Sequence, residues 1–262
     1  MKQGKVRVFA QEILPLSLCD YLGEPACVIF FSGCNYDCGY CQNWRLKVRS
    51  KEHLVDLDNI KESIRKNKLI TACKVTGGEP LLQPEALSEL GRYSKSLGLK
   101  FGIDTNGSLP EPLKLLLPIL DLVSIDIKTT LNEEKYRKIT GAAKPCVDAV
   151  RKSLDMVMSS DAYADVRMVI IPGHNDSKEI VLSVAQSLRS LGYEEKARRG
   201  IASFTLVEFV PENAYSEKFR GLKNPSVESL RSLALSSNLP NVRITHRAAG
   251  FYLEVVGKQN KR

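Results

Sequence analysis

The sequence predicts an α/β fold in which about six strand–helix units form a parallel sheet. Short apolar runs rich in β-forming residues alternate with segments that carry leucine, isoleucine and valine at helical spacing. The connections between successive strands are long enough to hold a helix, which parallel strands require. No long Gly/Ser-rich or Pro-rich linker divides the 262 residues, so we expect a single domain.

The first two units surround a loop that is rich in cysteine. The run A-C-V-I-F-F, at 26–31, has the continuous apolar pattern of a strand buried on both faces. Apolar residues then recur at helical spacing over 57–64, directly after an aspartate. A second short strand at 71–76 leads into G-G-E-P. The next helix, at 84–97, begins with a proline, which suits a first helical turn, and a glycine can cap its end.

The same alternation continues along the rest of the chain. Further strands are expected at 99–105, 122–128, 164–171, 204–210 and 242–245. Further helices are expected at 112–120, 147–157, 180–191 and 227–235. Because the strands are expected to be parallel, their carboxyl ends should meet at one edge of the sheet.

Polar residues stand at the point where several of these strands end. The segment 77–79 follows one strand, Asp104 ends another, and Asp126 with Lys128 ends a third. Ligands bind at this edge in parallel α/β barrels and open sheets. Asn213 is explained equally well as an ordinary loop residue, because asparagine is common in loops and turns. The same explanation fits Asp126 and Lys128 less well, because each interrupts an apolar strand where it leaves the sheet.

The chain carries 38 lysine and arginine residues against 30 aspartate and glutamate residues, a formal charge of +8. Such a surface favours acidic partners, nucleic acid among them, although a generally basic, solvated surface is the simpler explanation. No apolar run reaches the ~20 residues of a membrane helix, and the N-terminus lacks the apolar core of a signal peptide. We therefore expect a cytoplasmic protein, in which clustered cysteines act as metal ligands or redox groups.

Three of the seven cysteines, Cys34, Cys38 and Cys41, share the segment G-C-N-Y-D-C-G-Y-C-Q-N with the spacing C-x3-C-x2-C. A structural zinc site and a ferredoxin-type cluster both require four ligands, and the other cysteines provide no second pair. Three thiolates without a fourth indicate an iron–sulfur cluster with one open iron position, which is a catalytic arrangement. Cys27 and Cys73 lie inside apolar strands and are expected to be core residues.

With Tyr40 before the last cysteine and T-G-G-E-P on the next predicted strand, this motif resembles the radical S-adenosylmethionine superfamily. The resemblance implies a partial (β/α)6 barrel and a [4Fe–4S] cluster held by the three thiolates. It implies that the open iron binds S-adenosylmethionine, whose cleavage by one electron yields a 5′-deoxyadenosyl radical that abstracts hydrogen. Two adjacent glycines suit a close approach of the backbone to this ligand.

The resemblance narrows to activating enzymes of glycyl radical enzymes. S-L-C-D-Y-L-G-E-P-A-C-V-I-F, from Ser17, is similar to the lead-in of activases that serve anaerobic ribonucleotide reductase. Four further segments are similar to short activases of the pyruvate formate-lyase type: D-T-N-G at Asp104, D-I-K at Asp126, R-M-V-I-I-P-G-H-N-D at Arg167 and V-P at Val210.

This similarity covers a core at about 17–213, so that 1–16 is an N-terminal lead-in and 214–262 a C-terminal βα extension of the single domain. Longer activases insert a ferredoxin-like domain with further cysteine clusters, which this chain lacks. The resemblance therefore implies the short form with one cluster. The implied partners are a glycyl radical enzyme as protein substrate and an external one-electron donor of flavodoxin or ferredoxin type, under anaerobic conditions.

The resemblance also assigns roles to individual residues. Tyr40 would contact the adenine, and Gly78 and Glu79 would bind the methionine amino group. Asp104 and Asp126 would together hold a monovalent cation, which relieves the repulsion between two carboxylates. Asp126 and Lys128 would lie near the ribose and carboxylate of the cofactor. The other implied cofactor-binding residues are Gln42, Gly77, Arg167 and Asn213.

Three positions depart from the family pattern. Gln42 stands where many activases have histidine, Leu22 where proline is frequent, and Asn213 where the pyruvate formate-lyase activase has a histidine that contacts the cofactor. These departures leave the substrate open between a glycyl radical enzyme and a small molecule or RNA. A non-catalytic iron–sulfur or zinc module is a third alternative, against which T-G-G-E-P argues.

Overall fold

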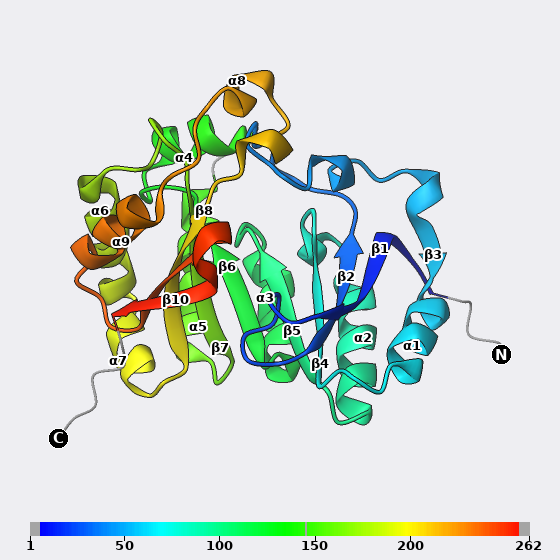
Figure 1. The fold of residues 1–262 in the computed structure, drawn as a ribbon. Helices are drawn as coiled ribbons and strands as arrows, with labels where there is room; N and C mark the ends of the chain where they lie inside the picture. The colour runs from blue at the N-terminus through cyan, green and yellow to red at the C-terminus, as the bar shows by residue number, and fades with distance from the viewer. Residues whose placement is uncertain (1–5, 145, 257–262) are drawn as a thin grey trace. The chain divides into compact units, whose positions relative to one another are not determined.

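The computed structural model describes residues 6–144 and 146–256, whose helices and strands are drawn in Figure 1. The chain divides into two compact units. The remaining residues of the predicted domain, 1–5, 145 and 257–262, lie outside the described residues. Unit 1 comprises Met1–Asn35, Asn43–Thr105 and Glu111–Val123. Unit 2 comprises Tyr36–Gln42, Asn106–Pro110 and Ser124–Arg262. The single domain stays a prediction.

Unit 1 is a small sheet with helices packed on it. Its strands are β1 (Arg7–Ser17), β2 (Ala26–Phe31), β3 (Leu54–Asp56), β4 (Ala72–Gly77) and β5 (Lys100–Thr105), in the order β3–β1–β2–β4–β5. Its helices are α1 (Leu57–Lys66), α2 (Pro84–Ser96) and most of α3 (Pro110–Leu116), with the 3₁₀ turns Trp44–Leu46, Lys51–His53, Pro80–Leu82 and Leu117–Ile119. Helix α2 packs on β4 and β5, and α1 packs on α2 and β1.

The parallel register of β2 and β4 positions two loops of unit 1. Phe31 lies beside Gly77, so both strands end at the same level of the sheet. The segment that carries Cys34 and the T-G-G-E-P segment therefore leave the sheet of unit 1 side by side. Within the strands, Cys27 and Cys73 are neighbours in the register and fully buried, which confirms the prediction that both are core residues. Burial raises the pKa of the Cys27 thiol to about 11.

Unit 2 repeats the strand–helix alternation. Its strands are β6 (Leu122–Asp126, whose first two residues belong to unit 1), β7 (Tyr163–Ile170), β8 (Ala202–Glu208), β9 (Val242–His246) and β10 (Gly250–Val256). Its helices are α4 (Glu133–Thr140), α5 (Val147–Ser159), α6 (Lys178–Ser190), α7 (Tyr193–Arg198), α8 (Glu217–Arg220) and α9 (Val227–Ser236), with 3₁₀ turns at Pro211–Asn213 and Arg247–Ala249. Strands β7, β8 and β9 are parallel neighbours.

The two faces of β7 and β8 differ sharply because side chains alternate along a strand. Val166 and Phe204 are register neighbours on one face and are fully buried. On the other face Asp165 lies beside Ser203, and Arg167 lies beside Thr205. Three of these four polar side chains are buried, and Arg167 is half-buried. This polar face of unit 2 carries one of the residues that the sequence assigned to the cofactor.

The structure confirms the α/β class with mostly parallel strands. It adds antiparallel strands that the patterns did not indicate, because β1 pairs antiparallel with β2 and β3, and β10 with β9. Irregularities in the pairing of β1 with β2 interrupt the alternation of buried and exposed side chains along β1. The sequence of β1 therefore lacks the period of two that indicates a strand. Strand β3 and helix α7 are too short to show a period. None of the helices in the described ranges is long and apolar enough to span a membrane.

Candidate functional site

The loop that carries Cys34 is held by main-chain hydrogen bonds within unit 1. The Gly33 N–H donates to the Leu46 carbonyl at 2.7 Å, and the Cys34 N–H donates to the Lys47 carbonyl at 3.0 Å. Gly33 has φ +103°, a conformation that residues with a side chain rarely adopt. The segment after the cysteine motif thus folds back on its first cysteine and fixes the backbone there.

The glycine pair of T-G-G-E-P is packed against this same loop. A Cβ atom on Gly77 would lie 2.1 Å from the Phe31 carbonyl oxygen, and one on Gly78 would lie 2.2 Å from the Gly33 carbonyl oxygen. The Glu79 N–H donates to that Gly33 oxygen at 2.7 Å. Both glycines are therefore required by the approach of two protein backbones. The sequence suggested an approach to the ligand, and the structure adds this second reason.

Glu79 is buried, and its carboxylate has partners within unit 1. One oxygen, Oε1, accepts from the Leu81 N–H at 3.0 Å and from the Thr105 hydroxyl at 2.9 Å. The first bond caps the short turn that follows T-G-G-E-P, and the second ties that turn to the end of β5. Glu79 therefore fixes the shape of the loop, and sequence reasoning did not single out Thr105 as its partner.

Asp104, at the end of β5, pairs with a lysine that the sequence analysis overlooked. The Lys74 ammonium lies 2.6 Å from Asp104 Oδ1, and the Lys74 side chain is fully buried. A signal was available, because Lys74 interrupts the apolar strand T-A-C-K-V-T as Lys128 interrupts its own strand. Neither the pairing nor the direction of the side chain can be read from the sequence.

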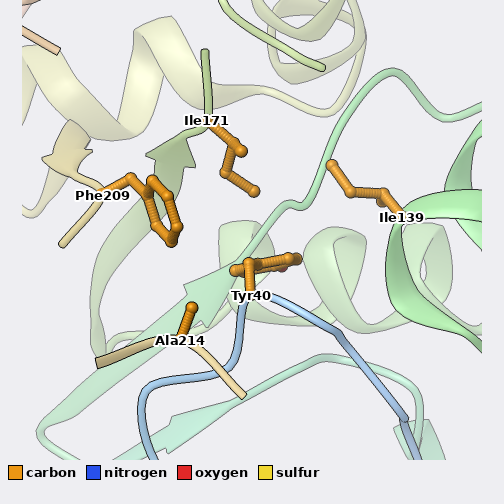
Figure 2. Close-up of a cluster of buried hydrophobic side chains, with 5 residues drawn as sticks. All are labelled: Tyr40, Ile139, Ile171, Phe209 and Ala214. Atoms are coloured by element: carbon orange, nitrogen blue, oxygen red, sulfur yellow. The ribbon is translucent and has the colours of Figure 1, made fainter. Parts of the chain in front are cut away.

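The other two cysteines of the motif belong to unit 2. The Cys41 N–H donates to the Cys38 carbonyl at 3.0 Å, which closes a tight turn around Tyr40. Figure 2 shows the Tyr40 ring among Ile139, Ile171, Phe209 and Ala214, with which it forms a buried apolar cluster. Cys38 packs against this cluster. Burial raises the pKa of Tyr40 well above its ordinary value, so its hydroxyl stays protonated.

Helix α8 covers the cysteine turn of unit 2, a role for the C-terminal segment that no motif indicated. The Ser216 N–H donates to the Gly39 carbonyl at 2.8 Å. The Phe219 ring meets the Tyr40 ring edge-on at 6.0 Å between centroids. A Cβ atom on Gly39 would lie 2.8 Å from the Phe219 ring, so a larger residue there would force this ring to move. His174 packs on Phe219 with 4.9 Å between ring centroids, which is a packing role.

Asp126 and Lys128 form an ion pair at the end of β6, with 2.7 Å between Asp126 Oδ2 and Lys128 Nζ. The ammonium also lies over the Tyr40 ring, 5.9 Å from its centroid. Burial by itself would lower the pKa of Lys128, but Asp126 and the neighbouring groups outweigh it, and this pKa lies well above its ordinary value. A permanent positive charge therefore stands beside the cysteine turn of unit 2.

Arg167 is tied to a buried carboxylate on the polar face of β7 and β8. Its Nε lies 2.6 Å from Asp165 Oδ2. The other oxygen of Asp165 accepts from the Ser203 hydroxyl at 2.9 Å and from the Thr205 hydroxyl at 2.7 Å. Asp165, Ser203 and Thr205 were not predicted, because the register between strands is needed to bring them together.

Asn175, in the segment P-G-H-N-D, connects the ends of β6 and β7. Its Oδ1 accepts from the Ile171 N–H at 2.7 Å, and its Nδ2 donates to the Lys128 carbonyl at 2.9 Å and the Val169 carbonyl at 2.8 Å. The side chain is fully buried. Asn175 thereby fixes the backbone of Lys128, which explains why an amide stands in this turn.

Asn175→Asp is expected to lower the free energy of unfolding by about 2–4 kcal/mol, because a carboxylate cannot donate to two buried carbonyl groups. Urea unfolding followed by circular dichroism measures this change. The neighbouring Asp176→Asn is the matched control: Asp176 is exposed and only accepts from the Gly173 N–H at 2.9 Å, so this change should stay within about 0.5 kcal/mol. Equal effects of the two variants would contradict the role given to Asn175.

The predicted site residues thus fall into two sets. Unit 1 holds Cys34, Gly77, Gly78, Glu79 and Asp104; unit 2 holds Cys38, Tyr40, Cys41, Gln42, Asp126, Lys128, Arg167 and Asn213. Gln42 and Asn213 are exposed. Within the described ranges no three His, Cys, Asp or Glu side chains are gathered as a metal site, so the three-thiolate ligand set stays a prediction from the motif.

Residues 28–184 match the family model of the radical SAM superfamily. The chain belongs to this superfamily. A protein of Methanocaldococcus jannaschii that bears the name glycyl-radical enzyme activating enzyme is 28% identical over 237 residues, 87% of this chain and 91% of the relative. The pyruvate formate-lyase-activating enzyme of Clostridium pasteurianum is 31% identical over 176 residues, 64% of this chain and 71% of the relative.

Solved structures show the same fold. A structure of TYW1 with a lysine-pyruvate adduct covers 90% of this chain and 81% of its own, with a TM-score of 0.61 and 16% identity. A domain of pyruvate-formate lyase-activating enzyme from Bacteroides vulgatus covers 66% of this chain and 98% of its own, with a TM-score of 0.51 and 21% identity. At these identities the likeness concerns the fold alone.

Membership of the superfamily makes this chain an enzyme of the radical SAM oxidoreductase type, which uses a [4Fe–4S] cluster and S-adenosylmethionine. The residues present fit these groups. Three closely spaced thiols suit an iron–sulfur cluster, and the glycine pair at 77–78 leaves backbone uncovered beside the Cys34 loop, where any side chain would collide.

Proposed function

We propose that this protein activates a glycyl radical enzyme by abstracting a hydrogen atom from a glycine Cα of that enzyme. The observation that carries the proposal is the similarity to a relative named for this activity, which extends over 87% of the chain. The single cysteine motif and the match to a pyruvate formate-lyase-activating enzyme support it. We place the reaction in the cytoplasm, with an external flavodoxin or ferredoxin as the one-electron donor.

When bound, the cluster and S-adenosylmethionine would supply a 5′-deoxyadenosyl radical, which takes the glycine hydrogen and leaves as 5′-deoxyadenosine. The chain's own residues would bind and orient the cofactor. In this proposal Cys34, Cys38 and Cys41 ligate the cluster, and Gly78 with Glu79 offers main-chain groups to the methionine amine while the buried Glu79 carboxylate holds this loop.

The residues of unit 2 would bind the rest of the cofactor. Tyr40 lies next to the Lys128 ammonium, which pairs with Asp126, and in this proposal the ring would contact the adenine and the ammonium the carboxylate. Asp126 would face the ribose, and Arg167 would lie beside the cofactor while Asp165 holds its guanidinium. Gln42 and Asn213 are exposed, so both are free to meet either cofactor or partner.

The test is anaerobic and uses the reconstituted full chain, S-adenosylmethionine, a reductant and candidate glycyl radical enzymes. We expect 5′-deoxyadenosine together with a glycyl radical signal in electron paramagnetic resonance on one candidate. Cys34→Ala should remove both products. Cys27→Ala is the matched control, because Cys27 is a buried core residue of β2 and should leave both products in place.

Production of 5′-deoxyadenosine without a glycyl radical on any candidate would overturn the activase proposal and leave radical SAM chemistry standing. It would then point to a small molecule or RNA as substrate. The basic surface makes RNA the first alternative to examine, and binding that weakens steeply with salt would identify it.

A further inference from the structure

A fully buried lysine occupies the middle of β4. Lys74 has no exposed side-chain surface, although both neighbouring positions of the strand are apolar. Its ammonium donates to the Asp20 carbonyl at 2.6 Å and lies 2.6 Å from Asp104 Oδ1. A charged group is rarely fully buried unless it is paired. The contacts with the Asp20 carbonyl and the Asp104 carboxylate therefore account for the burial of this ammonium.

The neighbouring strand is built to admit this side chain. Lys74 lies beside Gly102 in the register of β4 and β5, and Asp104 follows on the same face two residues later. A Cβ atom on Gly102 would lie 2.9 Å from the Tyr21 ring. The absence of a side chain at Gly102 therefore leaves room for the Tyr21 ring beside the strand position opposite Lys74.

We propose that Lys74 is a positioning residue whose ammonium is the built-in counter-ion of Asp104, so that this chain needs no monovalent cation at that carboxylate. The resemblance to activases implied a cation held by Asp104 and Asp126. In this chain each of the two carboxylates has an ammonium of its own unit, Lys74 at 2.6 Å and Lys128 at 2.7 Å. The charge that a cation would offset is offset by the protein itself.

The Lys74 ammonium has a second effect on the site. It joins Asp104 at the end of β5 to Asp20 in the S-L-C-D-Y lead-in, whose side chain accepts from the Ser17 hydroxyl at 2.5 Å. The lead-in is thereby fixed to the strand that carries a predicted cofactor residue. A bound metal cation can be exchanged for solvent ions, whereas a lysine side chain is permanent and independent of the medium.

The experiment compares the unfolding temperature of the reconstituted full chain in potassium chloride and in tetramethylammonium chloride at equal ionic strength. Tetramethylammonium is too large to be coordinated by a carboxylate in a small site. We expect the wild type to unfold at the same temperature in both salts. Lys74→Met should unfold on the order of 10 °C lower in tetramethylammonium chloride, because Asp104 loses the ammonium that lies 2.6 Å from it, and potassium should restore part of this loss.

Three further variants separate charge from packing. Lys74→Met combined with Asp104→Asn should lose the salt effect, because the Asp104 carboxylate, which would bind potassium, is then removed. Lys74→Arg should retain a salt-independent unfolding temperature. Lys196→Met is the matched control: Lys196 is also a buried lysine, but its ammonium bonds to the carbonyl groups of Val157 and Ser160, so the variant should be destabilised equally in both salts.

A second readout is the affinity of the reconstituted wild type for S-adenosylmethionine, which rests on the predicted place of Asp104 among the site residues and should be the same in both salts. The inference would be overturned if potassium tightened the affinity of the wild type for S-adenosylmethionine tenfold. It would also be overturned if the unfolding temperature of Lys74→Met were as insensitive to potassium as that of Lys196→Met. If Lys74→Met does not fold, the wild type and Lys74→Arg in the two salts decide the question. The unfolding readout needs no glycyl radical enzyme, so failure of the activase proposal would leave it intact.

Discussion

Gly78→Ala is expected to reduce the formation of 5′-deoxyadenosine by about 100-fold or more, the scale of loss that follows from a misplacement of about 1 Å at a reacting centre. The added Cβ would lie 2.2 Å from the Gly33 carbonyl oxygen and 3.3 Å from the Cys34 Cβ. Neither neighbour is the end of a flexible side chain, so the backbone of the cysteine loop must move. The hydrogen bond from the Glu79 N–H to the same oxygen would be strained as well.

Three measurements on the Gly78→Ala protein locate the damage. Iron content after reconstitution reports on the cluster, calorimetry reports the affinity for S-adenosylmethionine, and urea unfolding should show a loss of about 1–3 kcal/mol from overpacking. Gly98→Ala is the matched control, since an added Cβ there meets nothing within 4 Å. Its φ of +75° should cost about 1 kcal/mol of stability and leave activity unchanged. A Gly78→Ala enzyme with the wild-type rate would contradict this view of the loop.

The alternating fold was predictable because its strands are buried on both faces and its helices carry one apolar face. Continuous apolar runs such as 26–31 and spaced apolar residues such as 57–64 are direct consequences of that burial. Strand β1 escaped prediction for a physical reason. Its irregular pairing with β2 removes the regular alternation of buried and exposed residues, and its place beside β2 is set by tertiary contacts.

The part of the site that could be predicted is the part formed by residues close together in the chain. The cysteine motif and the adjacent glycines are contiguous in the chain, so their residue types and order carry the information. The contacts that complete the site join residues distant in sequence. Lys74 reaches Asp104 on another strand, and Phe219 covers a turn 180 residues before it. Such pairs depend on register and packing, which no local pattern encodes.

Asp165→Leu is expected to lower the free energy of unfolding by about 3–5 kcal/mol, because it removes one member of a buried ion pair. Arg167, with only 17% of its side chain exposed, would lose the carboxylate that lies 2.6 Å from its Nε. The hydroxyl groups of Ser203 and Thr205 would lose their acceptor at the same time. Asp165→Asn should cost less, since an amide oxygen can still accept from both hydroxyl groups.

A double-mutant cycle assigns this loss to the pair. The double variant Asp165→Leu/Arg167→Leu should be more stable than Asp165→Leu alone, because no unpaired charge remains on the polar face of β7 and β8. Additive effects would show that the two side chains act independently.

The affinity for S-adenosylmethionine separates structure from function in the same proteins. If Arg167 binds the cofactor and Asp165 orients it, Asp165→Asn should weaken binding by about tenfold, near 1.4 kcal/mol, while it remains folded. Unchanged affinity in Asp165→Asn and in Arg167→Leu would remove Arg167 from the cofactor site and leave this pair a structural role in unit 2.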